Sequence, residues 1–259
     1  MIDLHCHILP GVDDGAATLD DAVAMARVAA SDGILAAVAT PHGAEWAYCG
    51  SAEETKNRVQ DVQAALAQAN VALDLLPGLE AHLRPEMGAA CTRGEIYTLN
   101  SSRYLLVEFP LQALPVYADQ ALFNLQLRGI VPIIAHPERN QAIVAGPELL
   151  WRMVEKGMLT QITAGSLVGE FGAKTREVAE LLVRHRMAHI IASDSHSAMW
   201  RAPRLSAAVE RASDLIGPRD AEAMVVDIPR AIVNDEIVDV PPPLPLEKRR
   251  SWFPFGRRK

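Results

Sequence analysis

The chain has 259 residues, of which 49% are hydrophobic and 22% are charged, and this is enough to bury one large core of the size found in a single α/β barrel. Its formal net charge is −7, but Lys and Arg outnumber Glu by five within residues 247–259, so the preceding body carries −12. Such an acidic body argues against binding of nucleic-acid phosphates over its general surface.

Strand-like runs alternate with amphipathic helical stretches along most of the chain, which is typical of βα units built around a parallel sheet. We expect strands at 2–7, 34–40, 73–80, 104–109, 130–135, 160–164 and 188–193. We expect helices at 19–32, 51–70, 117–128, 147–156, 172–186, 203–215 and 218–224. The pairs Thr18 with Asp21 and Ser51 with Glu54 have the spacing of capping boxes at the first two helices.

Polar residues recur where the apolar strand runs end. The first strand reads I-D-L-H-C-H, which sends His5 and His7 to the same face because strand side chains repeat every second residue. Comparable ends read A-T-P-H, G-L-E, V-E-F-P, I-I-A-H-P-E-R and I-A-S-D-S-H. In a barrel of parallel strands these ends converge on one face. The candidates expected there are His5, His7, Asp14, His42, Glu80, Glu108, His136, Asp194 and His196.

These nine side chains are all His, Asp or Glu, a ligand set suited to Mn²⁺, Fe²⁺ or Zn²⁺ more than to thiolate-bound metals. Nine ligands are too many for one ion, whereas bridging carboxylates would let them hold two or three. Burying so many ionisable groups without metal would be costly. Because clustered metals commonly serve displacement at phosphorus, the pattern points to a metal-dependent phosphoesterase.

The ordered set H-C-H, D-D-G, T-P-H, G-L-E, V-E-F-P, A-H-P-E-R and S-D-S-H resembles the PHP (polymerase and histidinol phosphatase) superfamily of metal-dependent phosphoesterases. The opening D-L-H-C-H-I-L-P-G-V-D-D-G-A is most similar to the bacterial PHP-class protein-tyrosine phosphatases of capsule and exopolysaccharide systems. The resemblance implies a single-domain α/β fold, a distorted (β/α)₇ TIM-like barrel, with three divalent metals, Mn²⁺ foremost. It also implies a phosphotyrosine-bearing protein as substrate, namely a tyrosine kinase of polysaccharide export.

The same resemblance assigns a role to each candidate residue. The first metal would be held by His5, His7, Glu80 and Asp194. Glu80 would bridge to the second metal, completed by Glu108 and His136. The third metal would be held by Asp14, His42 and His196. Arg139 and Arg201 match phosphate-binding positions of the family and, with His42, are the expected catalytic residues.

A metal-activated water can attack phosphorus directly, so no phosphoenzyme is required. A thiol-based tyrosine phosphatase needs an Arg six positions after its Cys, and this chain has none. The residues six positions after Cys6, Cys49 and Cys91 are Val12, Thr55 and Tyr97. Phenolate, with a pKa of about 10, leaves more readily than an alkoxide, which suits an aryl phosphate substrate.

Other functions stay open at this point. Within the same fold, a small-molecule phosphatase of the histidinol-phosphatase kind is the main alternative, and a nuclease fits the acidic body less well. From a different class, the barrel could be a non-catalytic binding module, against which the full ligand set speaks. His82 has no counterpart among the family ligands, so we expect it to hydrogen-bond to solvent or a loop.

The division of the chain is expected near residue 240. Residues 1–240 would form the barrel, and residues 241–259 a Pro-rich, basic, flexible tail that could contact an anionic membrane surface or a partner. The odd number of Cys residues, three, makes no disulfide framework and fits a reducing compartment. No apolar run approaches the roughly 18 residues of a membrane span, and no signal-peptide pattern is present, so we expect a cytoplasmic protein.

Overall fold

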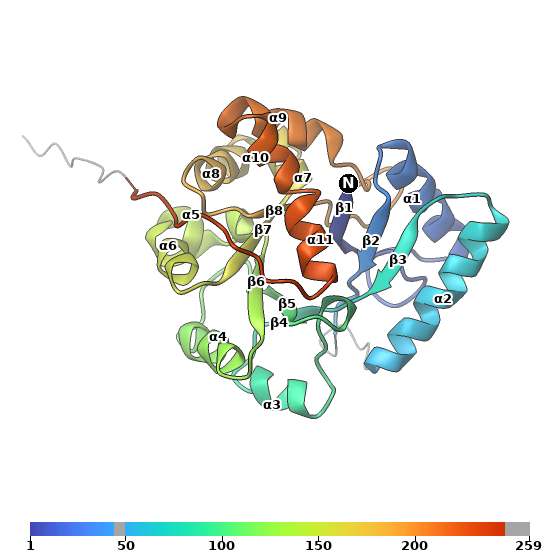
Figure 1. Ribbon diagram of the computed structural model, residues 1–259, viewed down its shortest axis with the longest axis horizontal. Helices are drawn as coiled ribbons and strands as arrows, with labels where there is room; N and C mark the ends of the chain where they lie inside the picture. The colour runs from blue at the N-terminus through green and yellow to red at the C-terminus, as the bar shows by residue number, and fades with distance from the viewer. Residues whose placement is uncertain (44–49, 247–259) are drawn as a thin grey trace, which may run out of the picture.

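The computed structural model describes residues 1–43 and 50–246 and shows strands surrounded by helices (Figure 1). Cys49 and the basic end at 247–259 lie outside the described residues. Two parallel sheets contain the strands. The first has the order β1 (Ile2–Cys6), β2 (Ala36–Ala39) and β3 (Asp74–Pro77). The second has the order β4 (Glu80–His82), β5 (Tyr104–Glu108), β6 (Val131–Ala135), β7 (Leu159–Thr163) and β8 (Ile190–Ala192).

Two isolated parallel bridges close these sheets into one distorted barrel. Cys6, at the end of β1, pairs with Ser195 just beyond β8, and His42, beyond β2, pairs with Glu80 at the start of β4. The expected single strand at 73–80 is therefore wrong in detail, because the chain breaks at Gly78 and Leu79 into β3 and β4. β3 pairs with β2 while β4 pairs with β5, so the broken strand joins the two sheets.

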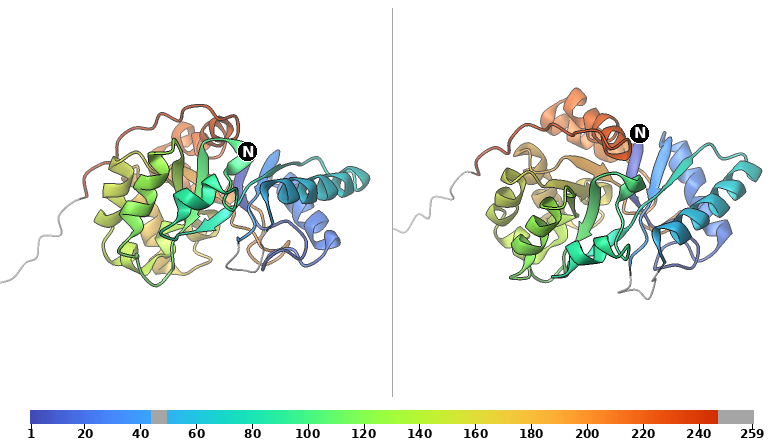
Figure 2. Two further views of the ribbon diagram at one scale, coloured as in Figure 1. Left: turned by 90° about the horizontal axis from the view of Figure 1, so that it is seen from below. Right: turned by 60° about the horizontal axis from the view of Figure 1, so that its bottom comes forward.

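The helices expected from the sequence form close to the expected ranges. They are α1 (Leu19–Ser31), α2 (Ala52–Gln68), α4 (Ala118–Gln126), α6 (Glu148–Glu155), α8 (Ala173–Arg184), α9 (Ser206–Ile216) and α10 (Pro218–Ala223). Both capping boxes are present at α1 and α2. Figure 2 shows α1 and α2 on one side of the barrel and α4 and α6 on the other.

Shorter helices were not anticipated, since segments of five to seven residues carry little periodicity. They are α3 (Met87–Thr92), α5 (Gln141–Ala145), α7 (Ala164–Val168) and α11 (Asp227–Val233). A 3₁₀ turn at Pro137–Arg139 directly follows His136. The 3₁₀ turn and α7 matter because they border the candidate site, and the turn contains Arg139.

Apolar side chains fill the barrel interior. Buried residues of successive strands meet there and are joined by Ile232 of α11; the set includes Leu4, Val38, Leu106, Ile133, Leu159 and Ile190. α11 thus covers the end where the strands begin, which leaves the opposite end for polar side chains. A second, larger cluster packs the strands against the surrounding helices. In the described part of the chain, no helix is both long and apolar enough to cross a membrane.

The first residues of the expected tail lie against the barrel. The Leu244 backbone N–H donates to the carbonyl of His185 at 2.8 Å, and its carbonyl accepts from the Trp151 indole at 3.1 Å. Leu246 packs against the larger apolar cluster. The contacts extend the ordered body at least to residue 246.

Candidate metal centre

Glu80 lies at the centre of a group of imidazoles at the carboxyl ends of the strands. Its Oε2 atom is 3.3 Å from His5 Nε2, 3.4 Å from His7 Nε2 and 3.1 Å from His42 Nδ1. Its other oxygen, Oε1, is 3.1 Å from His136 Nε2. Glu80 is only 1% exposed, so its charge faces these imidazoles instead of water. Residues from four separate strand ends therefore meet on one carboxylate.

Glu108 lies on the side of this cluster nearer to solvent. One carboxylate oxygen is 3.7 Å from His136 Nε2, and the other is 3.9 Å from His42 Nδ1. His82 Nδ1 lies 3.4 Å from Glu108 Oε2, so His82 contacts the edge of the site and not only solvent. This extends the prediction made for His82 from the sequence.

Asp14 gathers a further set of imidazoles. Its Oδ1 atom is 3.2 Å from His196 Nε2 and 3.7 Å from His42 Nε2. The His7 and His196 rings are 4.1 Å apart between centroids. Asp14 is exposed, which places this end of the cluster at the mouth of the site.

Three overlapping groups of side chains could each hold a metal ion, with their donor atoms within 4.8 Å of one another. One group is His7, Asp14, His42 and His196; a second is His5, His7 and Glu80; a third is His42, Glu80 and Glu108. The groups share Glu80, His7 and His42, so the arrangement suits several adjacent ions. Asp194 Oδ1 lies 3.4 Å from His5 Nε2 and 3.6 Å from His7 Nε2, at the edge of the second group.

The site also fits cations electrostatically. Burial alone would lower the pKa of His7, but Asp13 and Glu80 raise it to about 10. Moreover, His5 Nε2 and His7 Nε2 face one another at 3.1 Å. If both nitrogens carried protons, neither could accept a hydrogen bond from the other. The electrostatic field at the site favours positive charge, and its nitrogen atoms converge without protons to share. Divalent ions bound between these atoms would meet both conditions.

Buried side chains outside the ligand set orient the imidazoles. His7 Nδ1–H donates to Asp13 Oδ2 at 2.7 Å, and His5 Nδ1–H donates to Gln161 Oε1 at 2.9 Å. These bonds leave the Nε2 atom of each ring facing Glu80, as is usual for metal-binding histidines. The sequence analysis missed both residues. Asp13 stands in the D-D-G motif beside Asp14, whereas Gln161 is one of many polar residues in strand runs and gave no signal.

The backbone is also constrained at the site. His136, Asp194 and Arg201 adopt left-handed conformations with φ of 31°, 51° and 51°. Non-glycine residues seldom adopt this region, and where they do the surrounding contacts must hold them there. Asp3 supplies such contacts, since it accepts from the Ser193 backbone N–H at 2.9 Å and from that of His5 at 3.3 Å. β1 and β8 are thereby tied together beside Asp194.

Arg139 and Arg201 both reach Asp194. Their guanidinium nitrogens lie 2.7 Å and 2.5 Å from its Oδ2 atom, while its Oδ1 atom faces the histidines. Burial raises the pKa of Asp194, but the charges of His5, His136 and Arg201 outweigh burial and hold that pKa far below its ordinary range. The Phe171 ring lies 4.9 Å from Arg139 Cζ and 6.0 Å from Arg201 Cζ. The two arginines thus form one cationic wall at the edge of the cluster.

The described cysteines are poor nucleophiles. Burial raises the pKa of the Cys6 thiol well above its ordinary value, and Cys6 Sγ accepts a hydrogen bond from Ser195 at 3.1 Å. Burial also raises the pKa of Cys91. Since the thiolate is the nucleophilic form, neither group suits a thiol mechanism.

Comparisons with known proteins agree with this geometry. The profile of the CpsB/CapC family, described as capsular polysaccharide synthesis, matches residues 1–234. Tyrosine-protein phosphatase YwqE of Bacillus subtilis is 36% identical over 98% of this chain and 100% of its own length. Tyrosine-protein phosphatase CpsB of Streptococcus pneumoniae is 27% identical over 92% of this chain and 100% of its own length.

Solved structures show the same fold. One comes from work on YwqE of Bacillus subtilis and CpsB of Streptococcus pneumoniae, described as unique metal-dependent tyrosine phosphatases. It matches with a TM-score of 0.92 and 35% identity over 96% of this chain and 100% of the other. A dihydropyrimidinase from Brevibacillus agri, with a TM-score of 0.52 and 11% identity over 90% of this chain and 70% of its own, shares the barrel fold alone.

Proposed function

This chain belongs to the CpsB/CapC family of capsular polysaccharide synthesis, and on that premise we propose that it is a metal-dependent protein-tyrosine phosphatase. The observation that carries this proposal is the convergence of His5, His7, His42 and His136 on the buried carboxylate of Glu80. Relatives over nearly the full length of the chain are tyrosine phosphatases, and one solved structure is of a metal-dependent enzyme of that kind.

We propose three divalent ions, with Mn²⁺ preferred because the donors are imidazoles and carboxylates without thiolate. His5, His7, Glu80 and Asp194 would hold the first ion, and Glu80, Glu108 and His136 the second. Asp14, His42 and His196 would hold the third. When bound, such ions lower the pKa of water and offset the charge on phosphate oxygens.

The protein's own contribution is to orient and to bind. Asp13 and Gln161 fix the His7 and His5 rings so that their Nε2 atoms face the centre. Arg139 and Arg201 lie beside Asp194 and would bind the phosphate oxygens turned away from the ions, since guanidinium suits this bidentate role. Burial raises the pKa of the Cys6 and Cys91 thiols, which supports water as the nucleophile and a reaction without a cysteinyl-phosphate intermediate.

The proposed substrate is phosphotyrosine in a protein kinase that regulates capsule or exopolysaccharide synthesis. The family name and the activities of YwqE and CpsB support this choice. The phosphatase would then act in the cytoplasm, where such a kinase meets its ATP.

Steady-state rates test the proposal and its main alternative, a small-molecule phosphatase. A phosphotyrosine peptide, histidinol phosphate and a 3′-labelled oligonucleotide should be compared with Mn²⁺ present and after chelation. We expect the peptide to have the highest kcat/KM and chelation to abolish its hydrolysis. A histidinol phosphate preference would favour the small-molecule alternative, whereas undiminished hydrolysis in metal-stripped protein, or none with any metal, would contradict the proposal.

A further inference from the structure

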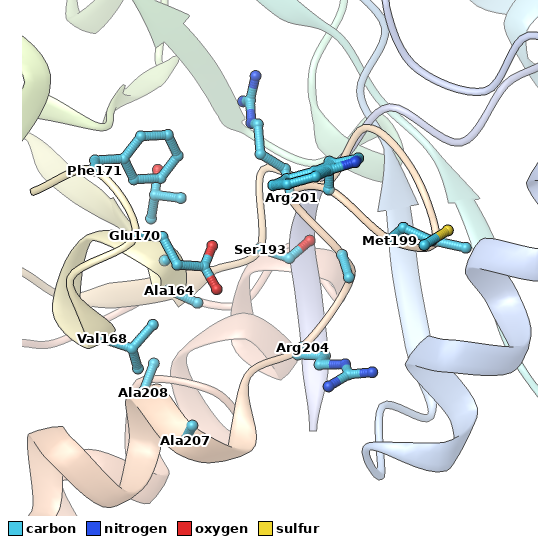
Figure 3. A pocket seen from close by; sticks show the side chains of 15 residues that line it. Ala164, Val168, Glu170, Phe171, Ser193, Met199, Arg201, Arg204, Ala207 and Ala208 are labelled. Atoms are coloured by element: carbon cyan, nitrogen blue, oxygen red, sulfur yellow. The ribbon is translucent and has the colours of Figure 1, made fainter.

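A pocket of about 920 Å³ lies beside the candidate metal centre (Figure 3). It is bounded by α7, by the residues that follow this helix, by the segment between β8 and α9, and by the start of α9. Ser193 and Arg201 both line it, and Arg201 reaches Asp194 at 2.5 Å. The pocket therefore borders the place where the proposed function puts the phosphate group.

The walls of this pocket are mostly apolar, and part of them is unusually exposed. Trp200 and Met199 are 84% and 86% exposed. The turn is nevertheless held in place, because Ser197 Oγ donates to the Trp200 carbonyl at 2.6 Å and accepts from the Trp200 backbone N–H at 2.8 Å. Val168 and Phe171 line the opposite wall. An ordered turn that presents large apolar side chains to solvent at the rim of a cavity is typical of a binding surface.

One carboxylate, that of Glu170, points into this apolar space (Figure 3). Glu170 is exposed, and its carboxylate lies close to the Gly165 backbone, since a Cβ atom at residue 165 would lie 2.6 Å from Glu170 Oε2. The arginines of the pocket do not neutralise it: Arg201 pairs with Asp194, and the Arg204 side chain is directed away from the interior in Figure 3. Within the described ranges, Glu170 takes part in no ion pair.

We propose that this pocket binds a lysine or arginine side chain of the substrate protein, one that lies close in sequence to the phosphotyrosine. The aliphatic stem of that side chain packs between Trp200 and Val168, and its cationic head meets Glu170. Long basic side chains combine an apolar stem with a charged end in this way. The inference rests on the proposed function, because phosphotyrosine must occupy the metal centre for its neighbour to reach the pocket.

Peptides that differ at one position test this inference. In a set of phosphotyrosine peptides, each position from −2 to +2 carries lysine, norleucine or alanine in turn, and kcat/KM is measured with Mn²⁺. At one position or more we expect lysine to exceed norleucine by roughly threefold to fivefold, the upper part of the range of an exposed ion pair. Norleucine should in turn exceed alanine, since it keeps the stem without the charge.

Two variants separate the charge from the stem. Glu170→Gln should bring the lysine peptide down to the norleucine level and leave the norleucine peptide unchanged. Trp200→Ala should reduce kcat/KM for both the lysine and the norleucine peptide relative to the alanine peptide. Glu155→Gln is the matched control, because Glu155 is an exposed carboxylate on α6 that does not line the pocket, and it should keep the lysine preference.

The outcomes distinguish this inference from the proposed function. If the parental enzyme hydrolyses the lysine and norleucine peptides equally at every position, or Glu170→Gln keeps the preference, the pocket assignment is wrong while the phosphatase stands. If no phosphotyrosine peptide is hydrolysed with metal, the proposed function fails and the pocket assignment fails with it.

Discussion

Glu80 is the residue on which the geometry of the candidate centre depends most, since both its carboxylate oxygens face imidazole nitrogens. Because it would bridge two ions, Glu80→Ala should lose more than one metal equivalent per chain by elemental analysis. Asp14→Ala is the comparison, as Asp14 lies at the exposed edge and joins only one of the three groups. It should lose about one equivalent. Full metal content in Glu80→Ala would refute the bridging role.

Arg139 and Arg201 should affect turnover without removing metal. Each single Ala variant leaves the other guanidinium on Asp194 Oδ2, so the carboxylate stays in place and metal content should remain normal. Loss of a preorganised charge partner typically costs on the order of 10²-fold in rate. We therefore expect kcat/KM to fall by about that factor on every phosphomonoester alike.

Lysine variants at the same two positions are the control for charge. Arg139→Lys and Arg201→Lys should recover only part of the activity, because lysine keeps the charge but lacks the bidentate fork. If both Ala variants turn over substrate at the parental rate, phosphate is bound elsewhere.

His189 makes stability depend on pH from a position outside the metal centre. Burial lowers its pKa to about 4, and its Nδ1 atom accepts from the Thr160 backbone N–H at 3.1 Å. The unfolded chain, with a pKa of about 6.5, binds the proton more readily, so stability falls as pH drops from about 6.5 towards 4. Between pH 7 and pH 5 this contributes a loss of about 2 kcal/mol.

Urea unfolding at the two pH values measures this contribution. His189→Gln keeps an acceptor for Thr160 but cannot titrate, so its free energy of unfolding should fall less between pH 7 and pH 5 than that of the parental protein. Equal losses in the two proteins would show that His189 is not the titrating group.

Most of the candidate ligands could be predicted from the sequence because they lie at or just after the end of an apolar strand run, and parallel strands bring their ends together. Asp14, in the loop after β1, was found from the D-D-G motif. The same reasoning could not find Gln161, because its role depends on the fold bringing β7 close enough to β1 for Gln161 to reach His5. Nor could it show that Arg139 and Arg201 share one oxygen of Asp194, since that depends on the left-handed backbone at Asp194 and Arg201.

At the scale of elements, the break between β3 and β4 was not predicted, because residues 73–80 read as one continuous strand. Gly78 explains the break: a Cβ atom there would lie 2.6 Å from Val38 Cγ1 and 2.9 Å from Leu99 Cδ2. The glycine lets the chain pass close to its neighbours as it moves from pairing with β2 to pairing with β5. Glu80 follows two residues later and depends on this path.

Gly78→Ala should therefore destabilise the fold by about 1–3 kcal/mol, the usual cost of overpacking a buried position. Urea unfolding gives the change, and elemental analysis should show reduced metal content because Glu80 is displaced. Gly146→Ala is the matched control, since a Cβ atom there meets no atom closer than 3.6 Å and its φ is −146°. Equal stability of the two variants would leave the break without this explanation.

At the scale of the whole molecule, the two ends of the barrel have separate roles. α11 closes the end where strands begin, so substitutions there act through stability, while the opposite end holds the candidate ligands and the neighbouring pocket. The sequence predicts a boundary at residue 240 between the barrel and the tail. The match to the family profile ends at residue 234, yet Leu244 and Leu246 contact the barrel, so the ordered body continues further.

Two truncations locate where the body ends. A chain that stops after residue 246 should keep the full free energy of unfolding and metal content. A chain that stops after residue 240 loses both Leu244 hydrogen bonds and the apolar contact of Leu246, which should cost about 1–3 kcal/mol. The Trp151 indole also loses its carbonyl partner in the shorter chain. Since both truncations remove Trp252, the tryptophan emission of the two truncated chains should be compared with each other, and it should differ. If the two truncated chains unfold at the same urea concentration, residues 241–246 belong with the tail, and the boundary stays at 240.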